Sequence, residues 1–372
     1  MISVKNVVRA AGVAMALLLA AGAARADTHA PWPTDWNDWN DPALWVTVGN
    51  KGNTGELSGA GAGGAGQDRI CGAVGYTFNM GKFEVTAGQY TAFLNAIAKT
   101  DTYGLYNAHM DTPLGWCGCN IQRSSSSGSY TYSVASDWAN CPVNYVSWGD
   151  CARFANWLTN GQPTGAQGLT TTEDGSYYLD GATDTPTLMG VTRIAEAQRT
   201  LGKNYYFIPT EDEWYKAAYH RNDGVTGNYW DYPTASNQIP NNSLIDPDPG
   251  NSANIYESGR YTIGSPYWRT EVGSFENSAS PYGTFDQGGN LWEWTETNGP
   301  GQVRALRGAS FRCDALDYQM LAAYRNNFTH PASENETDSY GFRVSEVPEP
   351  ATMSLLALGG LGMLMRRRSV RG

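Results

Sequence analysis

The stretch from Phe285 to Thr295, FDQGGNLWEWT, constrains the fold of this chain more than any other. Gly288 and Gly289 allow the backbone to turn tightly just after the carboxylate of Asp286. Alternation along the strand-like run that follows places two tryptophans on one face and three other side chains on the opposite face: Trp292 and Trp294 against Leu291, Glu293 and Thr295. We therefore expect a tight acidic turn that leads directly into a strand.

Residues 1–26 have the features of a secretory signal peptide. Lys5 and Arg9 precede an apolar run, and Ala24-Arg25-Ala26 forms a small-x-small cleavage site. We expect the mature chain to begin near Asp27 and to be exported through the inner membrane.

Residues 347–372 have the features of a second targeting segment. Val347-Pro348-Glu349-Pro350 precedes an apolar segment, 351–365, and a run of arginines. The apolar segment is short for a membrane span, which takes about 20 residues. This end resembles the PEP-CTERM sorting signal of Gram-negative bacteria. The resemblance implies transient membrane anchoring, cleavage by an exosortase, and a place at the cell surface or in the extracellular matrix. An ordinary C-terminal membrane anchor is the alternative.

The charge of the chain argues against nucleic acid as a partner. The formal net charge is −11, and removal of residues 1–26 and 351–372, which carry seven basic side chains and no acidic one, lowers it to −18. Such a chain repels phosphate backbones and anionic lipid. With 13 Trp, 22 Tyr and 43 Gly, we expect aromatic packing joined by many turns.

Three segments have the same strand-to-helix pattern, each with a capping box. The predicted cap pairs are Thr86 with Gln89, Ser147 with Asp150, and Thr210 with Glu213. Apolar residues at helical spacing follow each cap, and the second helix places Cys151 on its core face. A strand is predicted before the first cap, over Val74 to Met80.

Long irregular segments fill the rest of the chain. Residues 27–67 form an N-terminal extension with a Gly-rich loop, and residues 68–346 form the organised domain. Within that domain, Thr159 to Lys203 is predicted as a surface excursion with a helix near Thr185 to Thr200. Asp223 to Ser280 is predicted as long ordered coil of the kind that often carries function.

Six cysteines in an exported chain could form disulfides, which sequence alone does not pair. We expect Cys141 to pair with Cys117 or Cys119, around a hairpin near Gly128 to Val134. Cys151 is expected to stay reduced.

Six motifs together resemble the formylglycine-generating enzyme, or sulfatase-modifying factor, family. In order they begin at Lys82 (KFEVTAGQY), Pro142 (PVNYVSWGD), Ile208 (IPTEDEW), Gly289 (GNLWEW), Arg307 (RGAS) and Gly341 (GFR). The resemblance spans roughly Val74 to Val344. It implies an α+β, C-type-lectin-like fold: a single domain with little regular secondary structure and long ordered loops, stabilised by calcium.

The resemblance implies two calcium sites. The first would use the carboxylates of Asp286 and Glu293 and the carbonyls of Gly289 and Leu291, an oxygen-only set that suits Ca²⁺. A Gly-Gly turn flanked by solvated acids is the alternative. The second would use the ligands Asn254 and the carbonyl of Ile255, but a serine stands in Gly264 to Trp268 where the family pattern has an aspartate.

The sequence departs from the family pattern at the position that the resemblance implies is catalytic. The resemblance implies a copper(I) ion held by two thiolates just after the Arg307-Gly-Ala-Ser310 segment, since two soft sulfurs suit that ion. Cys313 supplies the first, with Ser310 beside it. The second should fall near Asp317 or Tyr318, but no cysteine follows Cys313 in the sequence, and His330 is the nearest histidine.

Three functions remain open from the sequence. The first is a non-catalytic, calcium-stabilised binding module, whose loops Thr159 to Lys203 and Asp223 to Ser280 line a groove for a cell-surface peptide or glycan. The second is a copper-dependent oxidase that converts a sulfatase cysteine to formylglycine through Cys313. The third is a structural component of the extracellular matrix.

Overall fold

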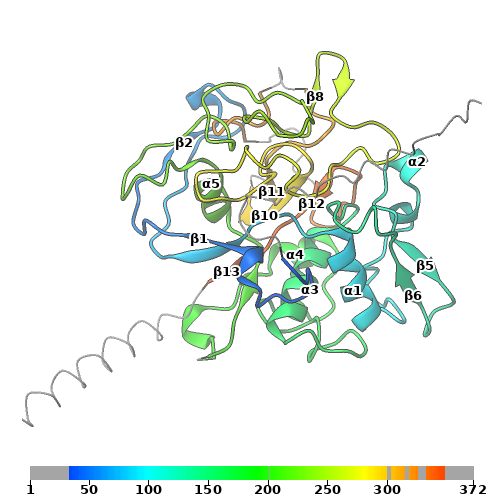
Figure 1. The fold of residues 1–372 in the computed structure, drawn as a ribbon. Coiled ribbons are helices and arrows are strands. Elements are labelled where there is room, and N and C mark those ends of the chain that lie inside the picture. Colours follow the sequence, from blue (N-terminus) through cyan, green and yellow to red (C-terminus); the bar gives the residue numbers. More distant parts are fainter. Residues whose placement is uncertain (1–32, 201, 300–302, 315–317, 326–331, 348–372) are drawn as a thin grey trace, which may run out of the picture. The chain divides into compact units, whose positions relative to one another are not determined.

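The computed structural model describes residues 33–200, 202–299, 303–314, 318–325 and 332–347. The predicted signal peptide and the apolar part of the predicted sorting signal lie outside these ranges. Helices and strands each account for only 18% of the described residues, and long loops connect them, which confirms the predicted α+β fold with little regular structure (Figure 1). Within the described ranges, none of the helices has the length and apolar character needed to cross a bilayer.

The four-stranded sheet brings both ends of the domain together. Its order is β1-β4-β13-β7, with bounds Trp45–Val48, Phe78–Gly81, Ser345–Glu346 and Tyr206–Phe207. The late strand β13 lies between two earlier ones, and Ser345 is paired with both Met80 and Phe207 in antiparallel register. The strand predicted over Val74 to Met80 is therefore present, but shorter and shifted toward its C-terminal end.

The strand that follows the Gly-Gly turn lies in the three-stranded sheet. β10 (Trp292–Asn298) pairs antiparallel with β11 (Arg304–Arg307) and parallel with β12 (Tyr340–Gly341). Gly289 has φ +81°, and a Cβ there would lie 2.3 Å from the carbonyl oxygen of Asn254. Only glycine fits this close approach of two backbones.

Three two-stranded hairpins complete the strands: β2 (Glu56–Ser58) with β3 (Arg69–Cys71), β5 (Gln122–Ser124) with β6 (Thr131–Ser133), and β8 (Tyr256–Glu257) with β9 (Arg260–Tyr261). The hairpin predicted near Gly128 to Val134 corresponds to β5 and β6.

All three predicted capping boxes are confirmed. They begin α1 (Ala87–Ile97), α3 (Trp148–Thr159) and α5 (Glu211–Tyr219), and each cap side chain and its partner three residues later hydrogen-bond each other's backbone. Cys151 is buried on α3 and carries no disulfide, as predicted. Helices α1 and α3 pack through aromatic rings, with the centroids of Phe93 and Phe154 5.2 Å apart. The shorter helices are α2 (Pro113–Trp116), α4 (Thr185–Met189) and the 3₁₀ helices Pro42–Leu44, Ala60–Ala62, Ala108–Asp111 and Glu196–Gln198.

The helix predicted over Thr185 to Thr200 is much shorter in the structure. α4 ends at Met189, and Gly190 caps it. Beyond it, Arg193 forms an isolated bridge with Tyr177 and ion pairs with Glu213 and Glu296. These tertiary contacts hold the segment extended, so local helical periodicity is overridden.

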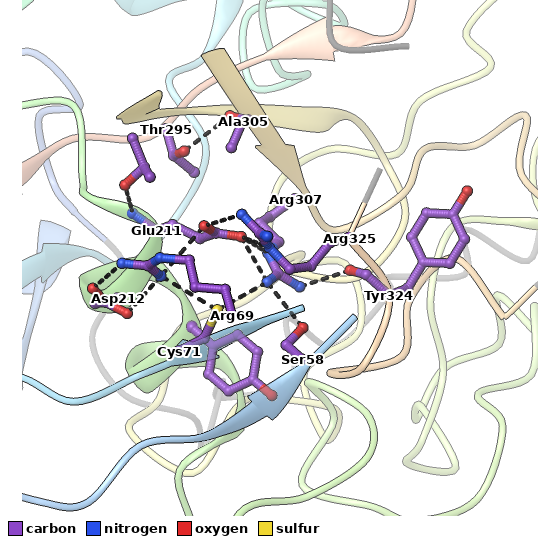
Figure 2. A network of polar contacts seen from close by, with 12 residues as sticks. Ser58, Arg69, Cys71, Glu211, Asp212, Thr295, Ala305, Arg307, Tyr324 and Arg325 are labelled. Atoms are coloured by element: carbon purple, nitrogen blue, oxygen red, sulfur yellow. Dashed lines mark hydrogen bonds and ion pairs between the residues drawn. The ribbon is translucent and has the colours of Figure 1, made fainter. Parts of the chain in front are cut away.

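Buried arginines join the elements. Glu211, at the start of α5, accepts hydrogen bonds from Arg307 and Arg325, and Arg69 lies 3.3 Å away (Figure 2). Burial alone would raise the pKa of Glu211, but these guanidinium groups lower it to about 2. Glu211 is thus a shared anion that ties β3, α5, β11 and the loop at Arg325 together.

Candidate functional site

The two predicted catalytic residues share one turn after β11. The Cys313 N–H donates to the Ser310 carbonyl at 2.9 Å. The Ser310 N–H donates to Cys313 Sγ at 3.3 Å, and the Ser310 hydroxyl lies 3.5 Å from the same sulfur. Ser310 is buried and Cys313 is half-buried. The sulfur of Cys313 is thus used as an acceptor within its own turn.

Arg312, between these residues, was not predicted as part of the site. Its side chain is 47% exposed, and its Nε donates to Asp338 at 2.8 Å. Its Nη2 also lies 3.4 Å from the sulfur of Cys117. Cys117, Phe311 and Leu291 form a small buried cluster. The turn therefore faces a cysteine from a distant part of the chain, which sequence spacing could not reveal.

Aromatic side chains surround this turn. The rings of Tyr261 and Trp268 meet edge to face at 4.9 Å, and both lie near Phe311. On the side of Cys117, Trp116 is 55% exposed and its ring centroid lies 4.3 Å from that of His109. The surface near Cys313 therefore offers exposed aromatic rings beside one arginine.

The structure has no disulfide among its six cysteines, which are all described. The predicted pairing of Cys141 with Cys117 or Cys119 is not formed. Instead the Cys141 thiol contacts the Arg269 carbonyl at 3.8 Å, and burial raises its pKa to about 12. Cys117 contacts Arg312 as described above. At the position predicted for a second copper thiolate, Tyr318 is 54% exposed, while Asp317 and His330 lie outside the described residues.

The four residues of the first predicted calcium set lie along one stretch of backbone, from Asp286 through the Gly-Gly turn to Glu293 at the start of β10. Glu293, however, is fully engaged: Arg343 donates to both of its oxygens at 2.6 Å, and Trp214 Nε1 donates at 2.7 Å. Asp286 accepts only the Gly273 N–H at 2.6 Å among described partners. Burial raises the pKa of Asp286 to about 6.

Glu84 is a third carboxylate at this place, and sequence reasoning missed it. It accepts hydrogen bonds from Asn290 Nδ2 at 2.9 Å and from the Leu291 N–H at 3.2 Å. Burial, followed by the charges of Asp286 and Glu293, raises its pKa well above the ordinary value. Its place in the KFEVTAGQY motif was the only sequence signal.

Two buried carboxylates, Glu84 and Glu293, and the half-buried Asp286 therefore have Arg343 as their main counter-charge. Carboxylate oxygens are ligands that calcium prefers, and the ion would compensate the excess charge. Within the described ranges, no group of three or more His, Cys, Asp or Glu side chains is arranged to hold a metal. Calcium stays a prediction, and Asp286 and Glu84 carry the unbalanced charge, since Arg343 already neutralises Glu293.

The second predicted calcium set adjoins the first. Asn254 Nδ2 donates to Asn290 Oδ1 at 2.9 Å and to the Trp268 carbonyl at 3.1 Å. Its buried Oδ1 has no partner among the described residues, which fits a cation ligand. The Ile255 carbonyl instead accepts from the hydroxyl of Thr262 at 3.1 Å. Of the two predicted ligands, only Asn254 has a free oxygen.

A groove of about 650 Å³ lies in the predicted excursion Thr159 to Lys203. Its lining comes from two short stretches: residues 178–184, and Thr187 with residues 190–192. None of these residues belongs to Asp223 to Ser280. The prediction that both long loops would line one groove is therefore not met by this groove.

Comparisons with known proteins agree with this fold. Residues 72–347 match the family described as the sulfatase-modifying factor enzyme 1-like domain, and residues 346–369 match the PEP-CTERM protein-sorting motif. None of the curated proteins compared with the chain matches it.

Several solved structures are similar over most of their length. They include CarF (18% identity, 82% of this chain and 98% of that chain, TM-score 0.45), variable protein 1 of Treponema denticola (15%, 82% and 95%, 0.47) and PvdO from Pseudomonas aeruginosa (17%, 76% and 84%, 0.40).

Proposed function

Because this chain belongs to the sulfatase-modifying factor enzyme 1-like family and carries a PEP-CTERM motif, we propose that it is a surface-sorted binding module without oxidase activity. The motif indicates an exported, surface-sorted protein and implies processing by exosortase. The proposed ligand is a glycan or peptide of the cell surface or extracellular matrix of a Gram-negative bacterium.

One observation carries the proposal. Cys313 Sγ accepts the Ser310 N–H at 3.3 Å inside its own turn. A thiol in this role stabilises the turn. A copper(I) site of the bis-thiolate kind needs a second sulfur, but the sequence has no cysteine after Cys313, and the Cys117 sulfur beside the turn contacts Arg312. The frame around the turn is intact, since the motifs that build β10, β11 and β12 are all present. A family scaffold with a thiol in a structural role suits recognition rather than oxidation.

Calcium belongs to the same proposal. Asp286, Glu84 and Asn254 would hold the ion, which would supply the positive charge that the buried carboxylates lack. The role proposed for the ion is to order the loops around the Gly-Gly turn, since two buried acids and the half-buried Asp286 without enough counter-charge oppose folding.

The oxidase alternative gives a direct test. The purified exported protein is supplied with copper(I), dioxygen and a Cys-x-Pro-x-Arg peptide, and mass spectrometry follows conversion of the peptide cysteine to the aldehyde. We expect no conversion above that of the Cys313→Ser variant. Conversion by the wild-type protein that Cys313→Ser abolishes would contradict the proposal.

A binding test complements it. The same protein is screened against defined surface polysaccharides and peptides by calorimetry. The proposal expects saturable binding to a member of the panel, whereas binding to none, together with no conversion, favours a purely structural matrix component.

A further inference from the structure

The groove at residues 178–192 is a preformed feature with two anchored walls. In the first wall, Arg153 donates to the Ala182 carbonyl at 2.8 Å and pairs with Glu173 through buried side chains. Glu173 in turn accepts the Gly181 N–H at 2.9 Å. A buried ion pair, with Arg153 from α3, therefore fixes the backbone of this wall.

The second wall is held by another buried arginine. Arg304 Nη2 donates to the carbonyls of Leu188 and Val191, both at 2.7 Å. The guanidinium of Arg304 also lies 3.7 Å from the ring centroid of Trp148. Because both walls are tied to the core, a ligand would meet little ordering cost on entry.

The accessible lining of the groove mixes polar and apolar surface, and its charged groups are all acidic. Asp180 and Asp184 are exposed, as are the threonines at positions 183, 187 and 192, and no lysine or arginine is among the lining residues. Tyr178 is 61% exposed, and its interaction with the nearby Asp180 carboxylate raises the pKa of its hydroxyl. The groove therefore presents two negative charges, several hydroxyl groups and the face of one aromatic ring.

These groups select the chemistry of the ligand. Carboxylates and the face of a tyrosine both attract an ammonium group. The hydroxyls match a ligand with many hydroxyl groups of its own. Three apolar lining residues, Leu179, Ala182 and Val191, are all under 9% exposed, so the Tyr178 ring is the one large apolar side chain of the lining that a ligand can pack against.

We propose that this groove binds a glycan that carries free amino groups, with Tyr178 against a sugar ring and Asp180 and Asp184 beside the protonated amines. This inference rests on the proposed binding function and specifies its ligand class and place. It assigns recognition to the excursion, which lies apart in sequence from the Cys313 turn.

The test uses a fully deacetylated glucosamine oligomer, a neutral glucose oligomer of the same length, and a lysine-rich peptide, measured by calorimetry on the full chain. We expect the amino-sugar oligomer to bind best and to bind less tightly as salt is raised. Tyr178→Ala should weaken this binding about tenfold. The double variant Asp180→Asn, Asp184→Asn should weaken it further, while Asn keeps the cap of α4.

Trp116→Ala is the matched control, because that ring is also exposed but lies near the Cys313 turn. It should leave the affinity unchanged, and melting curves verify that each variant is folded. If the amino-sugar oligomer binds but only Trp116→Ala weakens it, the groove proposal is wrong while the binding function stands. Stronger binding of the peptide or of the neutral oligomer, or no binding of the amino-sugar oligomer, would also overturn the groove proposal.

Discussion

At the scale of single residues, this domain places charges where solvent does not reach. Arg343 and Glu293 are both fully buried, and their bidentate pair is 2.6 Å long at each contact. The fold tolerates such a buried ion pair while both partners are present. Removal of one partner strongly destabilises the fold, because the other charge is then buried without compensation.

Arg343→Met should therefore destabilise the domain by about 3–5 kcal/mol, because Glu293 would keep its charge in the core without its main partner. Arg312→Met is the control, since the Arg312–Asp338 pair is partly exposed and such pairs contribute about 1 kcal/mol or less. Urea unfolding of the two variants measures the difference. Equal losses of stability would show that burial of the first pair is not what matters.

Lys216 is a buried cation that forms no described ion pair. Its Nζ donates to the Asn50 carbonyl at 3.0 Å, and burial lowers its pKa from 10.5 to about 8. The folded state therefore holds fewer protons at this site than the unfolded state between pH 8 and 10.5. Stability linked to Lys216 should rise with pH across that window and stay at its lowest level below it.

Lys216→Met should remove this dependence. We expect the variant to be more stable than wild type at pH 7, and the difference to shrink as pH approaches 10.5. The free energy of unfolding of both proteins, measured from pH 7 to 10.5, gives the comparison. A constant difference across the range would contradict the assignment.

At the scale of elements, the sequence predicted best those features that depend on residues close together in the chain. The three capping boxes need only residues three apart, and all three form. The helix near Thr185 to Thr200 was overpredicted, because Arg193 is drawn into ion pairs with Glu213 and Glu296 that lie far away in sequence. In the same way, Glu84 and Cys117 reach their sites through long-range packing, and no local pattern contains that information.

Thr86 offers a clean test of a cap. Its Oγ1 accepts the Gln89 N–H at 3.2 Å. Thr86→Ala should cost about 1 kcal/mol of stability, and Thr86→Ser should restore most of it because the hydroxyl is retained. Thermal unfolding of the three proteins checks this. An equal loss in both variants would assign the effect to the threonine methyl group instead of the cap.

At the scale of the whole molecule, the family and fold followed from six ordered motifs, and the PEP-CTERM motif followed from the C-terminal residues of the sequence. The predicted calcium ligands are only partly available in the structure. The turn at Asp286 is where sequence placed it, but Glu293 is engaged by Arg343, and the unbalanced charge rests on Asp286 and Glu84.

Removal of calcium should therefore lower the melting temperature of the whole domain. In Asp286→Asn, which removes one unbalanced charge, the melting temperature should respond less to chelator than in wild type. Differential scanning calorimetry with and without chelator compares the two. An unchanged wild-type curve in chelator would argue against a calcium site.

The central claim, a calcium-ordered module that binds rather than oxidises, is tested most directly by metal analysis of the purified exported protein after exposure to calcium and copper(I). We predict stoichiometric calcium, and copper no higher than in the Cys313→Ser variant. One bound copper per chain that disappears in Cys313→Ser would contradict the account.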